Sequence, residues 1–196
     1  MLTVIDCHSV DLDAIAQGAV LDVGSRGFRF SDYFAKRGHR VIALDPGENE
    51  SPPPGVEFLK LALTGRMGGF GKLVLTDDLE ARYVVRPDAD VDRPYLMVGC
   101  LTMPELMARV GVTEWDLMKL NAEGVEFDIL DAMTAPIARQ IVVSFHNHCG
   151  HAKRPEAEID GLVARLSQWY RVVRHQWDER YGAGRNAWDT VLVRRA

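Results

Sequence analysis

Acidic residues and glycines follow two apolar segments of the chain at spacings that suit a small polar ligand. Asp22 stands near the end of the first apolar run, residues 19–23, and Gly24 and Gly27 follow this run. Asp45 comes directly after the second run, 23 positions beyond Asp22. Glycines let a ligand approach the backbone closely, and nucleotide-binding units use a carboxylate at about this spacing to bind ribose hydroxyls. The sequence therefore predicts a nucleoside site at these residues.

The glycine turn differs from the fingerprint of dinucleotide-binding proteins. That fingerprint has three glycines in the order Gly-x-Gly-x-x-Gly, which serve a pyrophosphate. Here Gly24 and Gly27 are the only two, and a carboxylate at Asp22 would repel a pyrophosphate but suits a cationic amino-acid ligand. An NAD-dependent oxidoreductase is therefore a less favoured alternative, and a turn whose glycines serve only packing is another.

A second set of chemically useful side chains stands further along the chain. Glu123 follows the segment 115–120, and His146 and His148 follow the apolar run 141–145. An imidazole titrates near neutral pH, so His146 is our first choice for a general base and Glu123 is the second. His148 would share the face of His146 if the strand continues. The alternative for both histidines is a loop residue bonded to the backbone.

The same end of the chain allows a minor metal-binding alternative. Asn121, Glu123, His146 and His148 offer oxygen and nitrogen donors near two strand ends, where a divalent ion could orient a diol. We predict a site without a metal, and undiminished turnover in EDTA would exclude the ion.

The elements that must position these residues alternate between strand-like and helix-like segments. Strands are predicted at about 19–23, 40–44, 56–63, 115–120, 141–145, 170–177 and 188–193. Helices are predicted at about 25–37, 102–110, 124–133 and 155–169. Thr102 and Glu105 form a capping-box pattern at the start of the second helix. The alternation predicts an α/β fold that ends in an antiparallel strand pair.

Two segments fall outside this alternation. Residues 1–18 predict a short helix that packs against the first strand or covers it. Residues 64–100 predict a small β-rich insertion, with strands at about 72–75, 82–85 and 95–100. This insertion is equally consistent with a wall of a substrate site and with a meander that has no function.

Composition and charge limit the class of protein. The 196 residues are enough for one domain, 1–196, and the net charge of −5 argues against a general nucleic-acid binder. No apolar run approaches the roughly 18–20 residues of a membrane span, and the N-terminus lacks the pattern of a secretory signal. The three cysteines fit neither a disulfide framework nor a zinc spacing, so we expect a cytoplasmic protein. The oligomeric state cannot be read from the sequence.

The segment 116–130 resembles a hallmark of the FkbM family of methyltransferases. That family typically has Asp-Leu-x-Lys-Ile-Asp-x-Glu-Gly-x-Glu, preceded by a Thr-Leu-x-x-Leu helix, and this chain reads DLMKLNAEGVE at 116–126 and LTMPELM at 101–107. With the glycine turn and Asp45, the resemblance covers about residues 18–148. It implies a class I methyltransferase with a Rossmann-like fold, a seven-stranded, mostly parallel sheet and helices on both faces.

The resemblance also implies a cofactor, a reaction and roles for the residues. The cofactor would be S-adenosyl-L-methionine, and the reaction would be O-methylation of a sugar, a glycan or the hydroxyl of a small natural product. Asp22 and the turn would face the methionine half, Asp45 would hold the ribose, and residues 62–64 could touch the adenine. The implied cofactor-binding residues are Asp22, Gly24, Ser25, Gly27, Asp45 and Asn121. The candidate catalytic residues remain His146, Glu123 and His148.

The chain departs from the FkbM pattern at one position. Asn121 stands where the family usually has an aspartate. An amide accepts and donates hydrogen bonds, but it is neither a base nor a strong ligand for a hard metal. This departure favours, as an alternative, a non-catalytic module that keeps the fold and the cofactor.

Overall fold

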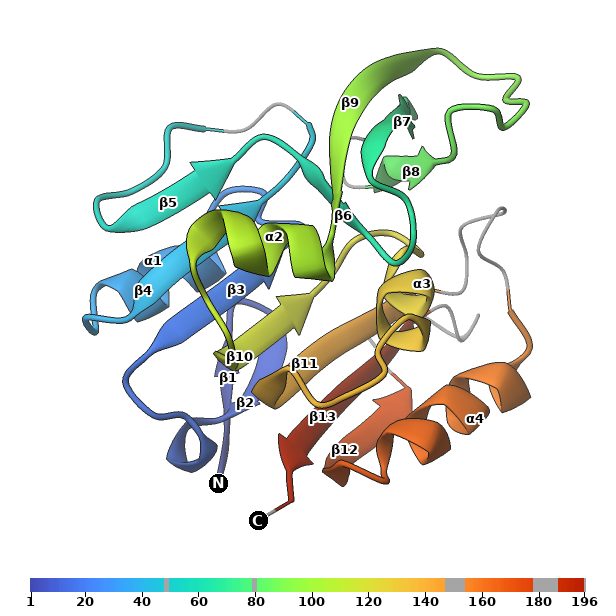
Figure 1. The fold of residues 1–196 in the computed structure, drawn as a ribbon. Coiled ribbons are helices and arrows are strands. Elements are labelled where there is room, and N and C mark those ends of the chain that lie inside the picture. Colours follow the sequence, from blue (N-terminus) through green and yellow to red (C-terminus); the bar gives the residue numbers. More distant parts are fainter. Residues whose placement is uncertain (48–49, 79–80, 147–153, 178–186, 196) are drawn as a thin grey trace.

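The fold is built on a central sheet of seven strands. The computed structural model describes residues 1–47, 50–78, 81–146, 154–177 and 187–195. The order across the sheet is β12-β13-β11-β10-β3-β4-β5 (Figure 1). These strands are β3 Ala19–Val23, β4 Arg40–Leu44, β5 Val56–Leu59, β10 Trp115–Leu120, β11 Ala138–His146, β12 Tyr170–Trp177 and β13 Ala187–Arg194. The five strands from β11 to β5 are parallel, and β13 is antiparallel to both of its neighbours, so the sheet is mixed.

Helices cover both faces of this sheet. Three helices, α2 Met103–Val110, α3 Glu126–Asp131 and α4 Glu156–Leu166, pack on one face, and α1 Arg29–Ala35 packs on the other (Figure 1). Alternate strand residues supply the two cores, since Leu21 and Ile42 meet the first group of helices while Val20 and Val41 meet α1. In the described part of the chain, no helix has the length and apolar character needed to cross a membrane.

A smaller sheet is inserted between β5 and α2. Its strands are β6 Ala62–Thr64, β7 Gly69–Val74, β8 Tyr83–Val85 and β9 Tyr95–Thr102, in the order β6-β9-β7-β8. Ala62, Leu73, Val84 and Cys100 form its own small core. The predicted β-rich insertion is therefore present, and the segment predicted as one strand at 56–63 is divided between the two sheets.

The N-terminal segment differs from its prediction. In place of a helix it forms a hairpin of β1 Leu2–Ile5 and β2 His8–Asp11, followed by a 3-10 helix at Leu12–Ala14. Ile5 and Val10 pack with Val142 and Val191 on the α1 face of the sheet. The hairpin therefore covers the part of this face that α1 does not reach.

Two helices begin later than their sequence patterns predict. The helix after the glycine turn begins at Arg29 because Gly27 and Phe28 have left-handed backbones, with φ of 71° and 54°. In the same way, α3 begins at Glu126 because Glu123 and Gly124 have φ of 52° and 103°. The predicted strands 19–23, 40–44 and 115–120 are confirmed residue by residue, and so is the capping box that opens α2.

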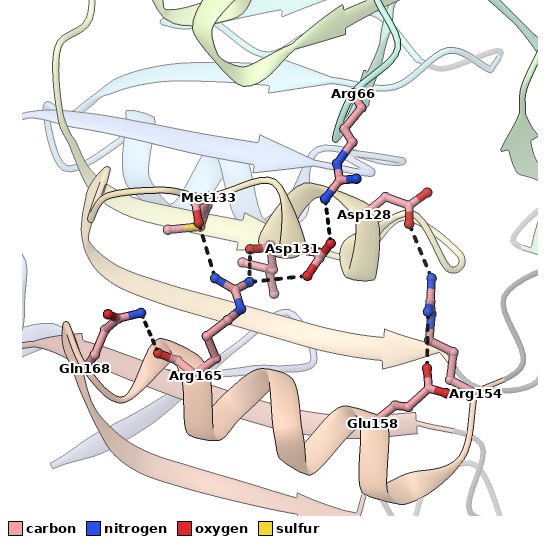
Figure 2. Close-up of polar contacts among 9 residues, drawn as sticks. Arg66, Asp128, Asp131, Met133, Arg154, Glu158, Arg165 and Gln168 are labelled. Carbon is pink, nitrogen blue, oxygen red and sulfur yellow. Dashed lines mark hydrogen bonds and ion pairs between the residues drawn. The ribbon is translucent and has the colours of Figure 1, made fainter.

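Arginines of the α4 region fix the position of α3. Where α3 ends, Arg165 donates to the carbonyls of Leu130 and Met133, at 2.8 and 3.2 Å. Figure 2 shows Arg165 reaching Met133. Arg154 joins Asp128 of α3 to Glu158 of α4, at 3.3 and 3.2 Å. The last carbonyls of a helix have no partners within it. The two bonds from Arg165 therefore anchor the C-terminal end of α3, the helix that follows β10.

We predict that two glycines of the turn after β3 will tolerate alanine differently. Both have positive φ, but a β-carbon on Gly24 would lie 1.8 Å from the backbone oxygen of Asn121, whereas one on Gly27 would meet nothing within 4 Å. Gly27→Ala should lower the free energy of unfolding by about 1–2 kcal/mol, the cost of a left-handed alanine. Gly24→Ala should cost clearly more in urea unfolding, and equal losses would contradict this contact.

Candidate active site

A cavity of about 510 Å³ lies at the carboxyl ends of β3, β4 and β10. This volume is within the range of small-molecule sites, and open α/β sheets bind ligands at this edge. Gly24, Gly27, Asp45 and Asn121 line it, although up to 97 positions separate them in the sequence. Four of the six residues predicted to bind the cofactor therefore meet in one cavity.

The inserted small sheet supplies the opposite wall of this cavity. Leu73 of β7, Tyr83 and Val84 of β8, and Arg82 just before β8 all line it. Ala62 and Leu63 of β6 line it as well, and a contact between residues 62–64 and an adenine stays a prediction. Of the two interpretations of the insertion, this placement favours the wall of a site.

The glycine turn is held against the neighbouring strand. The backbone nitrogens of Gly24 and Ser25 both donate to the Leu44 oxygen, at 2.8 and 3.2 Å. Ser25 is buried and does not line the cavity, whereas Gly27 lines it without a side chain to fill it. The backbone of the turn, rather than the Ser25 side chain, is thus offered to a ligand.

Asp22 lies beneath the cavity and is paired with a residue that the sequence analysis did not select. Its Oδ1 is 2.9 Å from the Lys119 Nζ, and its Oδ2 accepts a bond of 2.6 Å from Ser31. Lys119 also donates to the carbonyl oxygens of Val23 and Gly24, at 3.2 and 2.8 Å. Asp22 does not line the cavity, so it would influence a ligand indirectly, through Lys119 and the glycine turn. The sequence did contain a signal for this pair, namely a lysine inside a mostly apolar strand. A lysine buried in this way requires a buried counter-charge.

Asp45 presents a carboxylate to the cavity from the end of β4. Its Oδ1 accepts a hydrogen bond of 2.8 Å from the Gly47 nitrogen. Burial raises the pKa of Asp45, although the Gly47 bond and the positive charges of Lys119 and Arg26 oppose this change. The residue has the position and the acceptor oxygens that hydroxyl groups of a ligand would need.

Asn121 supplies a buried acceptor at the same cavity. Its backbone nitrogen donates to the Val23 oxygen at 3.1 Å, which fixes the end of β10 beside the glycine turn. Its side-chain Oδ1 is buried and accepts no hydrogen bond from the described residues. Buried polar atoms are nearly always bonded, so this oxygen fits a donor on a bound molecule.

His146 is completely buried between two carboxylates. Its Nδ1 lies 2.8 Å from Glu126 Oε1, and its Nε2 lies 3.4 Å from Glu123 Oε1. Glu126 also accepts bonds from the backbone nitrogens of Ala122 and Gly124, at 2.6 and 2.7 Å. Burial lowers the pKa of His146, but the negative charges of Glu126 and then Glu123 outweigh it, so the pKa is raised. His146 does not line the cavity.

Glu123 lines the cavity, and its carboxylate is in contact with His146. Its φ of 52° is uncommon for a residue other than glycine, and such strained residues cluster at functional sites. Glu126 accepts hydrogen bonds from the backbone nitrogens on either side of Glu123, and these bonds hold this conformation. The second-ranked candidate for the general base is therefore at the cavity, and the first-ranked candidate lies behind it.

The remaining predictions concern His148 and a metal. His148 lies outside the described residues. Across the described ranges, no group of three or more histidine, cysteine, aspartate or glutamate side chains has an arrangement that could hold a metal ion.

Comparison with known proteins identifies the fold but no family. No protein-family model and no curated protein sequence matches this chain. A chain of a fibrillarin–Nop5p complex superposes with a TM-score of 0.54 at 12% identity, over 96% of this chain and 77% of that chain. This likeness shows a shared fold.

Other structural neighbours are S-adenosylmethionine-dependent methyltransferases, some with bound cofactor or product. A TehB-like enzyme from Corynebacterium glutamicum matches with a TM-score of 0.47 at 14% identity, over 94% of this chain and 85% of that chain. The 1,6-didemethyltoxoflavin N1-methyltransferase of Burkholderia thailandensis, which contains S-adenosylhomocysteine, matches with a TM-score of 0.42 at 17% identity, over 91% of this chain and 71% of that chain. The FkbM resemblance stays a prediction.

We predict that Glu126→Gln will lower the pKa of His146. The carboxylate of Glu126 is the largest contribution that raises this pKa above the ordinary value of 6.5, so a neutral amide should bring it down. Titration of the histidine ring protons by NMR, assigned with His146→Gln, measures the change, and Asp128→Asn on the same helix is the control. An unchanged pKa in Glu126→Gln would contradict the pairing.

The sign of the accompanying change in stability follows from the same pKa. A raised pKa in the folded state means that protonated His146 stabilises the fold fully below its unfolded pKa. This contribution should disappear as the pH rises through the folded pKa.

Proposed function

We propose that this chain is an S-adenosylmethionine-dependent methyltransferase that methylates a hydroxyl group of a small-molecule or glycan acceptor. The observation that carries the proposal is the cavity where the glycine turn, Asp45 and Asn121 meet at the carboxyl edge of the parallel strands. Membership of the FkbM family is the finer form of the proposal, and the motif at 116–126 supports it.

The residues of the cavity fit this cofactor at each of its parts. Asp45 has oxygens for the ribose hydroxyls, and the apolar side chains of Ala62 and Leu63 suit the adenine. The buried Asn121 Oδ1 suits the ammonium of the methionine half, and the open space over Gly27 leaves room for its chain. When bound, the cofactor supplies an electrophilic methyl group, so the protein has to supply position and a dry pocket.

Glu123 is the residue we assign to proton transfer. A hydroxyl acceptor becomes a better nucleophile when a nearby base takes its proton, and Glu123 offers a carboxylate at the cavity. His146 is a positioning residue, since its Nε2 contacts Glu123 from the buried side. Glu126 orients His146 and the loop together.

A non-catalytic binding module is the second candidate, and Asn121 is the observation that favours it. An amide in place of the family's aspartate removes one acid from the site. The site still has a base in Glu123, so we favour the enzyme over the binding module.

We predict that the purified chain will bind S-adenosylhomocysteine and that Asp45→Asn will weaken this binding about 10–100-fold. Hydrogen bonds to a charged group contribute roughly 1.5–3 kcal/mol, which corresponds to this loss. Isothermal titration calorimetry measures it, and Asp32→Asn is the control, since Asp32 is a partly exposed acid of α1 that pairs with Lys36 and does not line the cavity. A wild-type chain that does not bind at sub-millimolar concentration would refute the proposed function.

We predict that Glu123→Gln will lower kcat by about 10²–10⁴-fold, the usual contribution of a general base. Affinity for S-adenosylhomocysteine should change little, because Glu123 acts on the acceptor. Release of S-adenosylhomocysteine, followed with an acceptor found in a panel of hydroxyl compounds, is the assay. Glu158→Gln, on the exposed side of α4, is the matched control. Cofactor binding without transfer to any acceptor would favour the binding module, and full activity in Glu123→Gln would remove the assigned base.

A further inference from the structure

Arg82 is a cation in the cavity wall that has no partner within the part of the chain that the structure describes. It stands directly before β8 on the insertion and lines the cavity. Its Nε is buried and has no hydrogen-bond partner, and no ion pair is formed with Asp78, which lines the same wall. Arg82 as a whole is partly buried.

The other partly or fully buried cations among the described residues are bonded. Lys119 pairs with Asp22 at 2.9 Å, and Arg174 pairs with Asp189 at 2.6 Å. Arg165 donates to two carbonyls at the end of α3. A buried N–H without an acceptor costs free energy, and a guanidinium carries five such donors with a charge that is never lost. Arg82 therefore differs from these residues in having donors left for a ligand.

The chemistry of a guanidinium identifies the kind of ligand. Arginine binds carboxylates and phosphates through two parallel N–H···O bonds, which no neutral group can match. The cavity also contains the acids Asp6, Asp45, Asp78 and Glu123. Their charges repel an anion, so an anionic group is favoured only beside a basic side chain of the wall.

The position of Arg82 separates this ligand from the cofactor. The proposed cofactor contacts at Gly24, Asp45 and Asn121 follow strands of the main sheet, and those at Ala62 and Leu63 lie on β6. Arg82 stands directly before β8, at the opposite edge of the small sheet from β6. Two exposed arginines that line the cavity at the glycine turn, Arg26 and Arg29, are available to the carboxylate of a methionine half. Arg82 is thus left for the second substrate.

We propose that the methyl acceptor carries a carboxylate or phosphate group and that Arg82 binds this anion. The proposal rests on the methyltransferase function proposed above. It makes Arg82 a specificity-determining residue, which would favour acidic acceptors over neutral ones of the same shape.

The test uses the full chain loaded with S-adenosylhomocysteine and two probes, inorganic phosphate and acetate. Calorimetric or NMR titration should show saturable binding of at least one probe, weakened at least tenfold in Arg82→Gln. Arg82→Lys keeps the charge but not the paired donors, so its affinity for the probe should lie between those of the wild type and Arg82→Gln. This variant also replaces Arg82→Gln in the test if Arg82→Gln does not fold. Arg86→Gln is the matched control, because Arg86 follows β8, is exposed and pairs with Asp88. Glycerol serves as the neutral probe.

Two results would overturn the proposal and leave the methyltransferase function standing. The first is a wild-type complex that binds neither anion more tightly than Arg82→Gln does. The second is a tenfold loss of S-adenosylhomocysteine affinity in Arg82→Gln, which would assign the arginine to the cofactor's own carboxylate. A chain that binds phosphate through Arg82 but never binds S-adenosylhomocysteine would keep the anion site and overturn the function.

Discussion

The buried ion pair between Asp22 and Lys119 is the constraint on which the site depends. The two residues lie directly opposite each other on the central parallel strands β3 and β10, and both are almost fully buried. A buried charge is tolerated only with a partner, and the removal of either partner leaves the other uncompensated. Because Lys119 also bonds the carbonyls of Val23 and Gly24, the pair fixes the glycine turn at the place where the cavity begins.

A second buried cluster plays the corresponding part for the loop after β10. Glu126 binds the backbone on both sides of Glu123 and the ring of His146 at once, so one carboxylate sets the loop and the histidine together. In both clusters a buried ion pair holds the backbone of a loop that lines the cavity. The bonds from α4 to the end of α3 extend this support to the far side of the helix.

The sequence predicted the parts of this structure that depend on local pattern. Mostly apolar segments located β3, β4 and β10, and Thr102 with Glu105 located the start of α2. The late starts of α1 and α3 were not predictable, since Phe28 and Glu123 adopt a backbone that their residue types disfavour. The sequence also did not show which of His146 and Glu123 would line the cavity. Both stand near the ends of predicted strands, and only packing decides which one is buried. The Asp22–Lys119 contact depends on the register between two strands, and 97 positions of the chain separate the two residues.

The separation of the two sheets has a consequence for how such a protein can diversify. Among the described strands, none of the small sheet pairs with the seven-stranded sheet, and the small sheet has its own core. Substitutions, insertions or exchange of residues 65–99 would therefore alter one wall without disturbing the pairs that hold the other. Under the proposed function, evolution could vary the acceptor through this module while the donor half is inherited intact.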